Sequence, residues 1–286
     1  MKNSPSLVFL FVIIALSVFT VTAQKSIERS QNREFCSDNN WSNGDQVSFK
    51  ELRQMTLPAT GSLAVDSGQN GGIHVTGTNR SDVLVRACVQ AWGASDEAAK
   101  ALASSIKISE GSEIRADSSM NDSHWSVSYD ISVPRNTDLK LNAHNGGISI
   151  DSVEGRLGFE TMNGGVSLRN VSGDVRGRTT NGGVHVALSG GSWQGSGLDV
   201  QTTNGGVSLV IPESYAANIE TGTTNGGYRS DIPSLNITTE NVSGDMSHRR
   251  RGGSIKTALN GGGAPIRLVT TNGGIRISSS ENASKY

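Results

Sequence analysis

Two stretches of the chain, Thr161-Met-Asn-Gly-Gly-Val-Ser-Leu168 and Thr179-Thr-Asn-Gly-Gly-Val-His-Val186, repeat one pattern that decides the fold. On both sides of each Asn-Gly-Gly, apolar residues alternate with polar ones, which is the period of a β-strand with one buried face. The tripeptide occurs eight times among the 286 residues. It begins at Asn70, Asn145, Asn163, Asn181, Asn204, Asn225, Asn260 and Asn272.

The spacing of these tripeptides indicates stacked coils. Asn145, Asn163 and Asn181 are 18 residues apart, and the next spacings, 23 and 21, fit the same unit with small insertions. A fixed period with the same residue types at the same offsets is typical of a solenoid. An antiparallel sandwich or meander is the alternative, because Asn-Gly between alternating runs is also a hairpin signal. The sequence therefore predicts an all-β fold, a β-solenoid that resembles a parallel β-helix.

Each coil would hold two short strands and two corners. One corner is Asn-Gly-Gly, and the other is a glycine-containing segment such as 152–155, 170–174 or 241–245. We expect glycine to supply positive φ at the corners, and the Asn amides to bond neighbouring coils. The prediction requires Leu157, Val175 and Leu198 to lie above one another in the core. The structural corner residues would be Asn145, Asn163, Asn181, Asn204, Asn225 and Asn272.

The region before the regular coils differs from them. Residues 47–137 carry longer alternating stretches and one helix candidate near 96–106, for which Ser95 is a suitable N-cap. We interpret this region as a β-rich cap that covers the open end of the stack, since repeat proteins need such caps. A partner-binding helix is the alternative. The predicted organisation is 1–23 signal peptide, 24–137 cap, 138–278 solenoid and 279–286 disordered tail.

The first residues have the pattern of an export signal. An apolar run from Leu7 to Val21 is followed by Val21-Thr-Ala23, which puts small residues before a plausible cleavage site. An uncleaved anchor is the alternative, although the run is shorter than a membrane span requires. We therefore expect an exported protein, periplasmic, cell-surface or extracellular, with no transmembrane span after signal removal. In an oxidising compartment Cys36 and Cys88 would form a disulfide, and two free thiols are the alternative.

The run Tyr129-Asp-Ile-Ser-Val-Pro134, then Leu139-Lys-Leu141, then the Thr-x-Asn-Gly-Gly-Val-x-Leu coils, resembles the "putative adhesin" family of bacterial exported proteins. The resemblance covers roughly residues 60–278. It implies an exported β-solenoid with a presumed role in adhesion and no catalytic residues to carry over. The chain departs from the family pattern over 226–262, where Tyr228-Arg-Ser230 breaks the alternation and Asn260 stands only 12 residues before Asn272. Coil register is open there.

No pattern of residues indicates catalysis. The outward positions gather no paired carboxylates, and Glu160 with Arg178 on the next coil is expected to be a surface ion pair. The five histidines, with His74 and His185 at the same offset after Asn-Gly-Gly, form no metal-binding spacing, so we expect neither metal nor cofactor. The basic cluster His248–Arg251 is expected to be a solvated loop. A net charge of −1 argues against nucleic acid.

These observations favour a non-catalytic exported protein. The sequence predicts a cell-surface or periplasmic binding or structural module, with envelope glycan or a surface protein as the partner. Two alternatives stay open, a polysaccharide-active β-helix enzyme and a periplasmic sensor or regulatory module. Fold-level analogy supports each of them, and a site is needed to decide.

Overall fold

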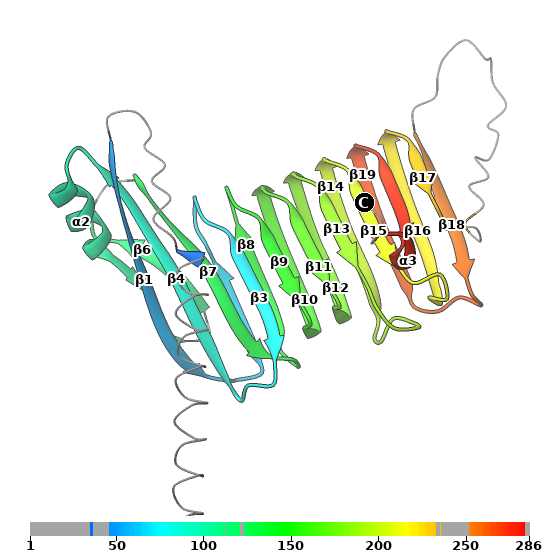
Figure 1. Cartoon of the computed structure of the whole chain (residues 1–286), viewed down its shortest axis with the longest axis horizontal. Helices are drawn as coiled ribbons and strands as arrows, with labels where there is room; N and C mark the ends of the chain where they lie inside the picture. Colours follow the sequence, from blue (N-terminus) through cyan, green and yellow to red (C-terminus); the bar gives the residue numbers. More distant parts are fainter. Residues whose placement is uncertain are drawn as a thin grey trace, which may run out of the picture.

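The computed structural model describes residues 35–36, 46–111, 113–120, 123–232, 235 and 252–283. Two ten-stranded sheets face each other along the long axis of the molecule (Figure 1). Sheet A contains, in spatial order, β1 (Val47–Pro58), β4 (Asp82–Gly93), β7 (Trp125–Pro134), β3 (Ile73–Thr78), β9 (Ile148–Asp151), β11 (Val166–Arg169), β13 (Val184–Ala187), β15 (Val207–Ile211), β20 (Ile275–Ser279) and β17 (Tyr228–Ser230).

Sheet B forms the second layer. It contains, in spatial order, β18 (Gly253–Leu259), β16 (Ala217–Asn225), β19 (Pro265–Asn272), β14 (Gly197–Asn204), β12 (Ser172–Asn181), β10 (Glu154–Asn163), β8 (Asp138–Ala143), β2 (Ser62–Asp66), β6 (Glu113–Ser118) and β5 (Ile106–Ile108). Each regular coil contributes one strand to each sheet, and the Asn-Gly-Gly corner joins the two. The core is the thin space between the sheets.

Strands of successive coils pair in parallel, which confirms the predicted solenoid. Leu157 lies opposite Val175, and Val175 lies opposite Leu198. All three side chains are buried, as the alternating pattern requires. Antiparallel pairing is confined to the two ends of the molecule, where β1, β4 and β7 pair at one end and β16 and β18 at the other.

The order of the coils differs from the order in the sequence. The coil of β14 and β15 is followed in space by that of β19 and β20, and only then by that of β16 and β17. Asn204 therefore lies next to Asn272 rather than Asn225. After β15 the chain forms β16 and β17 at the far end of the stack and returns through β18. It then forms β19 and β20 between that end coil and the coil of β14 and β15. The spacing of 21 between Asn204 and Asn225 does not mark neighbouring coils, so that part of the sequence interpretation was wrong.

Asn260 is not one of the stacked corners. It follows β18 and has positive φ, and its side-chain amide donates to the backbone oxygens of Glu213 and Tyr215. The other seven tripeptide asparagines form one ladder, because the Nδ2 of each donates to the Oδ1 of its neighbour at 2.7–3.0 Å. In spatial order these are Asn70, Asn145, Asn163, Asn181, Asn204, Asn272 and Asn225.

Except at Gly71, which has positive φ, the glycines of these corners serve close packing rather than positive φ, so the expectation holds only for the opposite corner. Positive φ falls on the opposite corner, at Ser152, Asn170, Gly155 and Gly173. At the first glycine of each stacked tripeptide, an added Cβ would overlap the backbone of the neighbouring coil; at Gly182 it would meet the carbonyl of Gly164. The side chain is excluded because the coils stack directly on one another.

The N-terminal region ends the stack as a cap. Helix α2 (Asp96–Ser105) is N-capped by Ser95 and packs on β4 and β1 through Ala99, Leu102 and Ala103. The Arg53 guanidinium of β1 donates to the carbonyl of Ala103 in the last helical turn. At the other terminus, residues 279–283 are not a disordered tail. Ser279 is buried in β20 and α3 (Ser280–Ala283) follows.

Three predicted features lie outside the described residues. They are the signal peptide of residues 1–23, the corner at 241–245 and the basic cluster His248–Arg251. Within the part of the chain that is described, no helix has the length and apolarity to cross a membrane.

Candidate functional site

An open groove runs along the outer face of sheet A. It has a volume of about 1230 Å³ and is lined by the starts of seven neighbouring parallel strands, together with Ser128 and Tyr129 of β7. Eight strands about 4.8 Å apart give it a length of roughly 34 Å. Such a shape suits an extended chain better than a compact small molecule.

The floor of the groove is bare backbone. It consists of the second glycine of each stacked tripeptide: Gly72, Gly147, Gly165, Gly183, Gly206, Gly274 and Gly227. Steric exclusion is weaker here, because an added Cβ at Gly183 would lie 3.4 Å from the carbonyl oxygen of Gly206, an ordinary contact; only at Gly72 and Gly147 would it be tighter, at 3.2 and 3.1 Å. No positive φ requires glycine at this position either. The second glycine therefore keeps the groove open, whereas the first lets the coils stack.

One wall of the groove is formed by the fourth residue after each asparagine. From the cap outward this row contains His74, Ser149, Ser167, His185, Ser208, Arg276 and Arg229. These residues point outward because the residues on either side of each point into the core. The lining contains hydroxyl, imidazole and guanidinium groups but neither Asp nor Glu.

The two histidines of the wall have different surroundings. His74 is half-buried and its Nε2 lies 3.1 Å from the hydroxyl of Thr76. Partial burial lowers the pKa of His185 below its usual 6.5, and the nearby charge of Arg169 lowers it further. His185 is therefore mainly neutral at pH 7 and can donate or accept a hydrogen bond. Ser149 and Ser167 lie between the two imidazoles.

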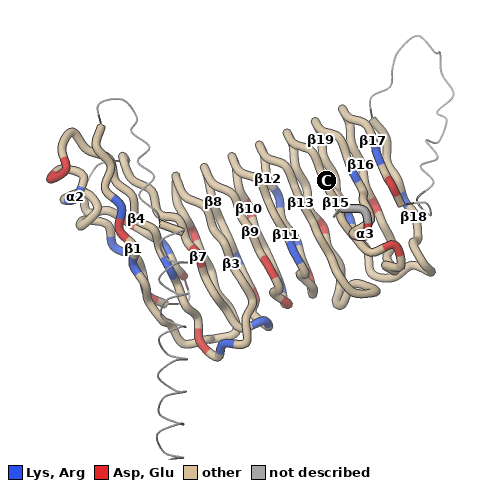
Figure 2. The backbone as a smooth tube through the Cα atoms, viewed as in Figure 1, with Lys and Arg blue, Asp and Glu red and all other residues tan. Residues whose placement is uncertain are grey.

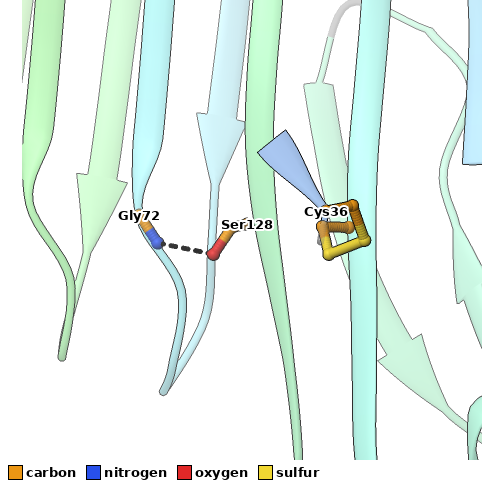
Figure 3. The surroundings of a disulfide bond; sticks show 4 residues. Cys36, Gly72 and Ser128 are labelled. Atoms are coloured by element: carbon orange, nitrogen blue, oxygen red, sulfur yellow. Dashed lines mark hydrogen bonds between the residues drawn. A yellow bond between two sulfur atoms is a disulfide. The ribbon is translucent and has the colours of Figure 1, made fainter. Parts of the chain in front are cut away.

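The cap closes one end of the groove. Cys36 and Cys88 are joined in a disulfide, which fixes Phe35 at the groove end and against the Arg86 guanidinium, 5.8 Å from the ring centre. Cys88 lies opposite Ser128, whose hydroxyl accepts a bond from the backbone N–H of Gly72 (Figure 3). The glycine floor thus runs up to the disulfide, and Phe35 is an end wall.

The outer face of sheet B has a different character. The ion pair of Glu160 and Arg178 is present at 2.7 Å, and Arg267 contacts Asp199 at 2.7 Å. A smaller polar pocket of about 620 Å³ lies beside them, lined mainly by threonines. Charged residues are thinly spread along the whole stack (Figure 2). Among the described residues no three His, Cys, Asp or Glu side chains are placed to hold a metal ion.

Sequence reasoning identified the residues of the wall but not the groove. The offset that places His74 and His185 on one row was visible, and so were Arg229 and Arg276. The order of the row was missed, because the inserted coil places Arg276 beside Ser208 and leaves Arg229, 47 residues earlier in the chain, at the end. The signal that could have indicated the groove was the second glycine, which stacking alone does not require.

The comparisons with known proteins bear on the fold. A family model described as Toastrack DUF4097 matches residues 48–278. No curated protein matches the chain significantly. One similar solved structure is described as a "putative cell adhesion protein" from Clostridium sporogenes ATCC 15579; it shows 12% identity, covers 81% of this chain and 100% of its own, and has a TM-score of 0.44. Another, a "putative adhesin" from Bacteroides fragilis NCTC 9343, shows 9% identity, covers 80% and 97%, and has a TM-score of 0.32.

Proposed function

The chain belongs to the Toastrack DUF4097 family, and on this premise we propose that it is an exported, non-catalytic binding module whose sheet A groove holds an extended envelope glycan. The single observation that carries the proposal is the groove with its glycine floor. The seven second glycines form a continuous track, and packing does not demand glycine at five of them, Gly165, Gly183, Gly206, Gly274 and Gly227.

The chemistry of the groove supports a glycan over a polypeptide. The carbonyl groups of the floor glycines are already paired between coils; the N–H of Val166 donates to Gly183, and that of Val184 donates to Gly206. A peptide laid on this floor would find these acceptors engaged and its own N–H groups without partners there, which is costly where water is excluded. A glycan would lay its C–H faces on the glycines and direct its hydroxyls to the serine and histidine wall.

The enzyme alternative has less support. Glu160 and Asp199, on the outer face of sheet B, each pair with an arginine on a neighbouring strand. Each carboxylate thus lies against a guanidinium group, whereas glycoside hydrolysis uses two carboxyl groups that flank the scissile bond. Glu160→Ala and Asp199→Ala are accordingly expected to leave polysaccharide binding unchanged.

Filling the groove tests the proposal. Gly183→Leu puts a side chain on the floor, and Gly158→Leu puts the same side chain on the outer face of sheet B, where the nearest atom is 3.7 Å away. We expect Gly183→Leu to abolish retention on immobilised polysaccharides in affinity electrophoresis, and Gly158→Leu to retain it. Thermal unfolding of both variants checks that the fold is kept. Equal retention of the two variants would remove the groove from the function.

A further inference from the structure

The open end of the groove carries two adjacent arginines. Arg229 of β17 and Arg276 of β20 are in register on neighbouring parallel strands, and both are exposed. Neither has a carboxylate partner in the described part of the chain. Like charges directly opposite one another in a sheet are destabilising. Stability therefore does not account for this pair.

Among the described residues, arginines in the regular coils of sheet B form ion pairs, in contrast to those in the coils of sheet A. The four in the regular coils of sheet B, Arg156, Arg176, Arg178 and Arg267, all form ion pairs with Asp or Glu. The three in the coils of sheet A, Arg169, Arg229 and Arg276, form none among the described residues. Arg229 and Arg276 thus place two guanidinium groups at the end of the groove that form no ion pair among the described residues. A groove lined without any Asp or Glu complements an anion.

The position of the end coil is fixed. Tyr228 replaces the Val or Ile of the other coils, and its hydroxyl accepts from the Thr223 N–H at 3.0 Å and donates to the carbonyl of Gly253. These bonds tie β17 to β16 and β18 across the end of the core. Arg229 follows directly, so its backbone is held beside Arg276. The Cα atoms of Arg229 and Arg276 are therefore held one strand spacing apart.

We propose that Arg229 and Arg276 form a carboxylate-binding subsite, and that the glycan in the groove is an acidic polysaccharide carrying uronate-type carboxylates. This inference rests on the proposed function and narrows its ligand. Guanidinium groups bind carboxylates through paired, charge-assisted hydrogen bonds. Sugar units behind the acidic group would extend along the glycine floor toward Phe35.

The experiment uses the full mature chain with two polymers of the same backbone. Polygalacturonate carries a carboxylate on each sugar, and fully methyl-esterified polygalacturonate carries none. We expect the wild-type protein to bind the acid form more tightly, by roughly tenfold or more for each arginine engaged. Arg229→Gln with Arg276→Gln should bind both polymers alike, at the affinity of the wild type for the ester.

Two controls make the result specific. Arg176→Gln with Arg178→Gln removes the same charge from sheet B and should keep the preference for the acid polymer. Arg229→Lys with Arg276→Lys keeps the charge without the planar fork, and should give an intermediate preference. Circular dichroism and thermal unfolding confirm that each variant is folded.

The outcomes separate this inference from the proposed function. Equal wild-type affinity for acid and ester forms overturns the carboxylate subsite and leaves the groove function standing. Absence of binding to either polymer overturns both. Poly-L-glutamate binding as tightly as polygalacturonate overturns the assignment to a glycan. Loss of the preference in the sheet B control would show general electrostatic attraction, and would also overturn the subsite.

Discussion

The two glycines of each Asn-Gly-Gly corner have different roles, and substitution of each by alanine should have different effects on stability. Gly182→Ala would drive a Cβ into the backbone of Gly164, and we expect it to destabilise the protein by about 2 kcal/mol or more. Gly183→Ala meets only an ordinary contact, and should change stability by less than about 1 kcal/mol. Urea unfolding of both variants measures the difference. Equal losses would mean that the floor glycines are needed for folding and not for the groove.

Buried threonines offer a second matched pair. The hydroxyl of Thr202 donates to the carbonyl of Gly182 at 2.8 Å, whereas the buried hydroxyl of Thr221 has no partner in the described structure. Thr202→Val should cost about 1 kcal/mol because a buried carbonyl loses its donor. Thr221→Val should stabilise by a similar amount, because an unsatisfied hydroxyl is removed. Thermal unfolding would contradict this account if both variants shifted in the same direction.

His185 links stability to pH through a lowered pKa. Burial, with Arg169 as a smaller cause, holds the folded-state pKa below the unfolded value of 6.5. As the pH falls through 6.5, the unfolded chain takes up its proton first, so the folded state loses stability. His185→Gln should therefore lose less stability than the wild type between about pH 7.5 and pH 5. Parallel slopes for the two proteins in denaturant titrations would exclude this contribution.

At the scale of the element, the strand β11 places neighbouring residues in opposite environments. Val166 is 2% exposed and points into the core, whereas Ser167 belongs to the groove wall. Val166→Asp should cost about 3 kcal/mol or more, because it buries an unpaired charge. Ser167→Asp should leave stability nearly unchanged and weaken binding of polygalacturonate through charge repulsion. Similar unfolding midpoints for the two variants would mean that the register is wrong.

The strands could be predicted from the sequence because each is decided locally. The period of two in Leu139-Lys-Leu141 or Val184-His-Val186 fixes which side chains face the core, and the parallel register follows from identical corners. The order of the coils could not be predicted in this way. The corner at Asn225 carries the same residues as that at Asn204, so each could accept the other as a neighbour. The coil of β16 and β17 takes the end position because β18 pairs antiparallel with the outer edge of β16. The position beside β14 and β15 is then left for β19 and β20.

At the scale of the whole molecule, coil order can be tested by cross-linking. Gln201 lies opposite Val269 on the outer face of sheet B, and Val269 lies between Gln201 and Gly222. Neighbouring strands are about 4.8 Å apart, which suits a disulfide, whereas two strands away is too far. Gln201→Cys with Val269→Cys should oxidise to a bridge, and Gln201→Cys with Gly222→Cys should not. Peptide mass mapping identifies the bridge. Bridging of only the second pair would restore the sequential order.

The order of the coils also decides which arginine ends the row. Had the coils followed the sequence, Arg229 would lie between Ser208 and Arg276, and Arg276 would stand at the end. In the observed order Arg276 lies beside Ser208, and Arg229 ends the row. The residues of the row could be predicted from their offset, whereas the residue at its end could not, because it depends on the coil order.

The inserted coil also has a consequence for biogenesis. Strands β16 and β17 pair with the stack through β19 and β20, which emerge later from the ribosome and from any export channel. The end coil of β16 and β17 therefore cannot reach its final position before β19 and β20 have been synthesised and exported. Until then β15 keeps an unpaired hydrogen-bonding edge. A chaperone that shields this edge would work on a nascent molecule whose first coils are already complete.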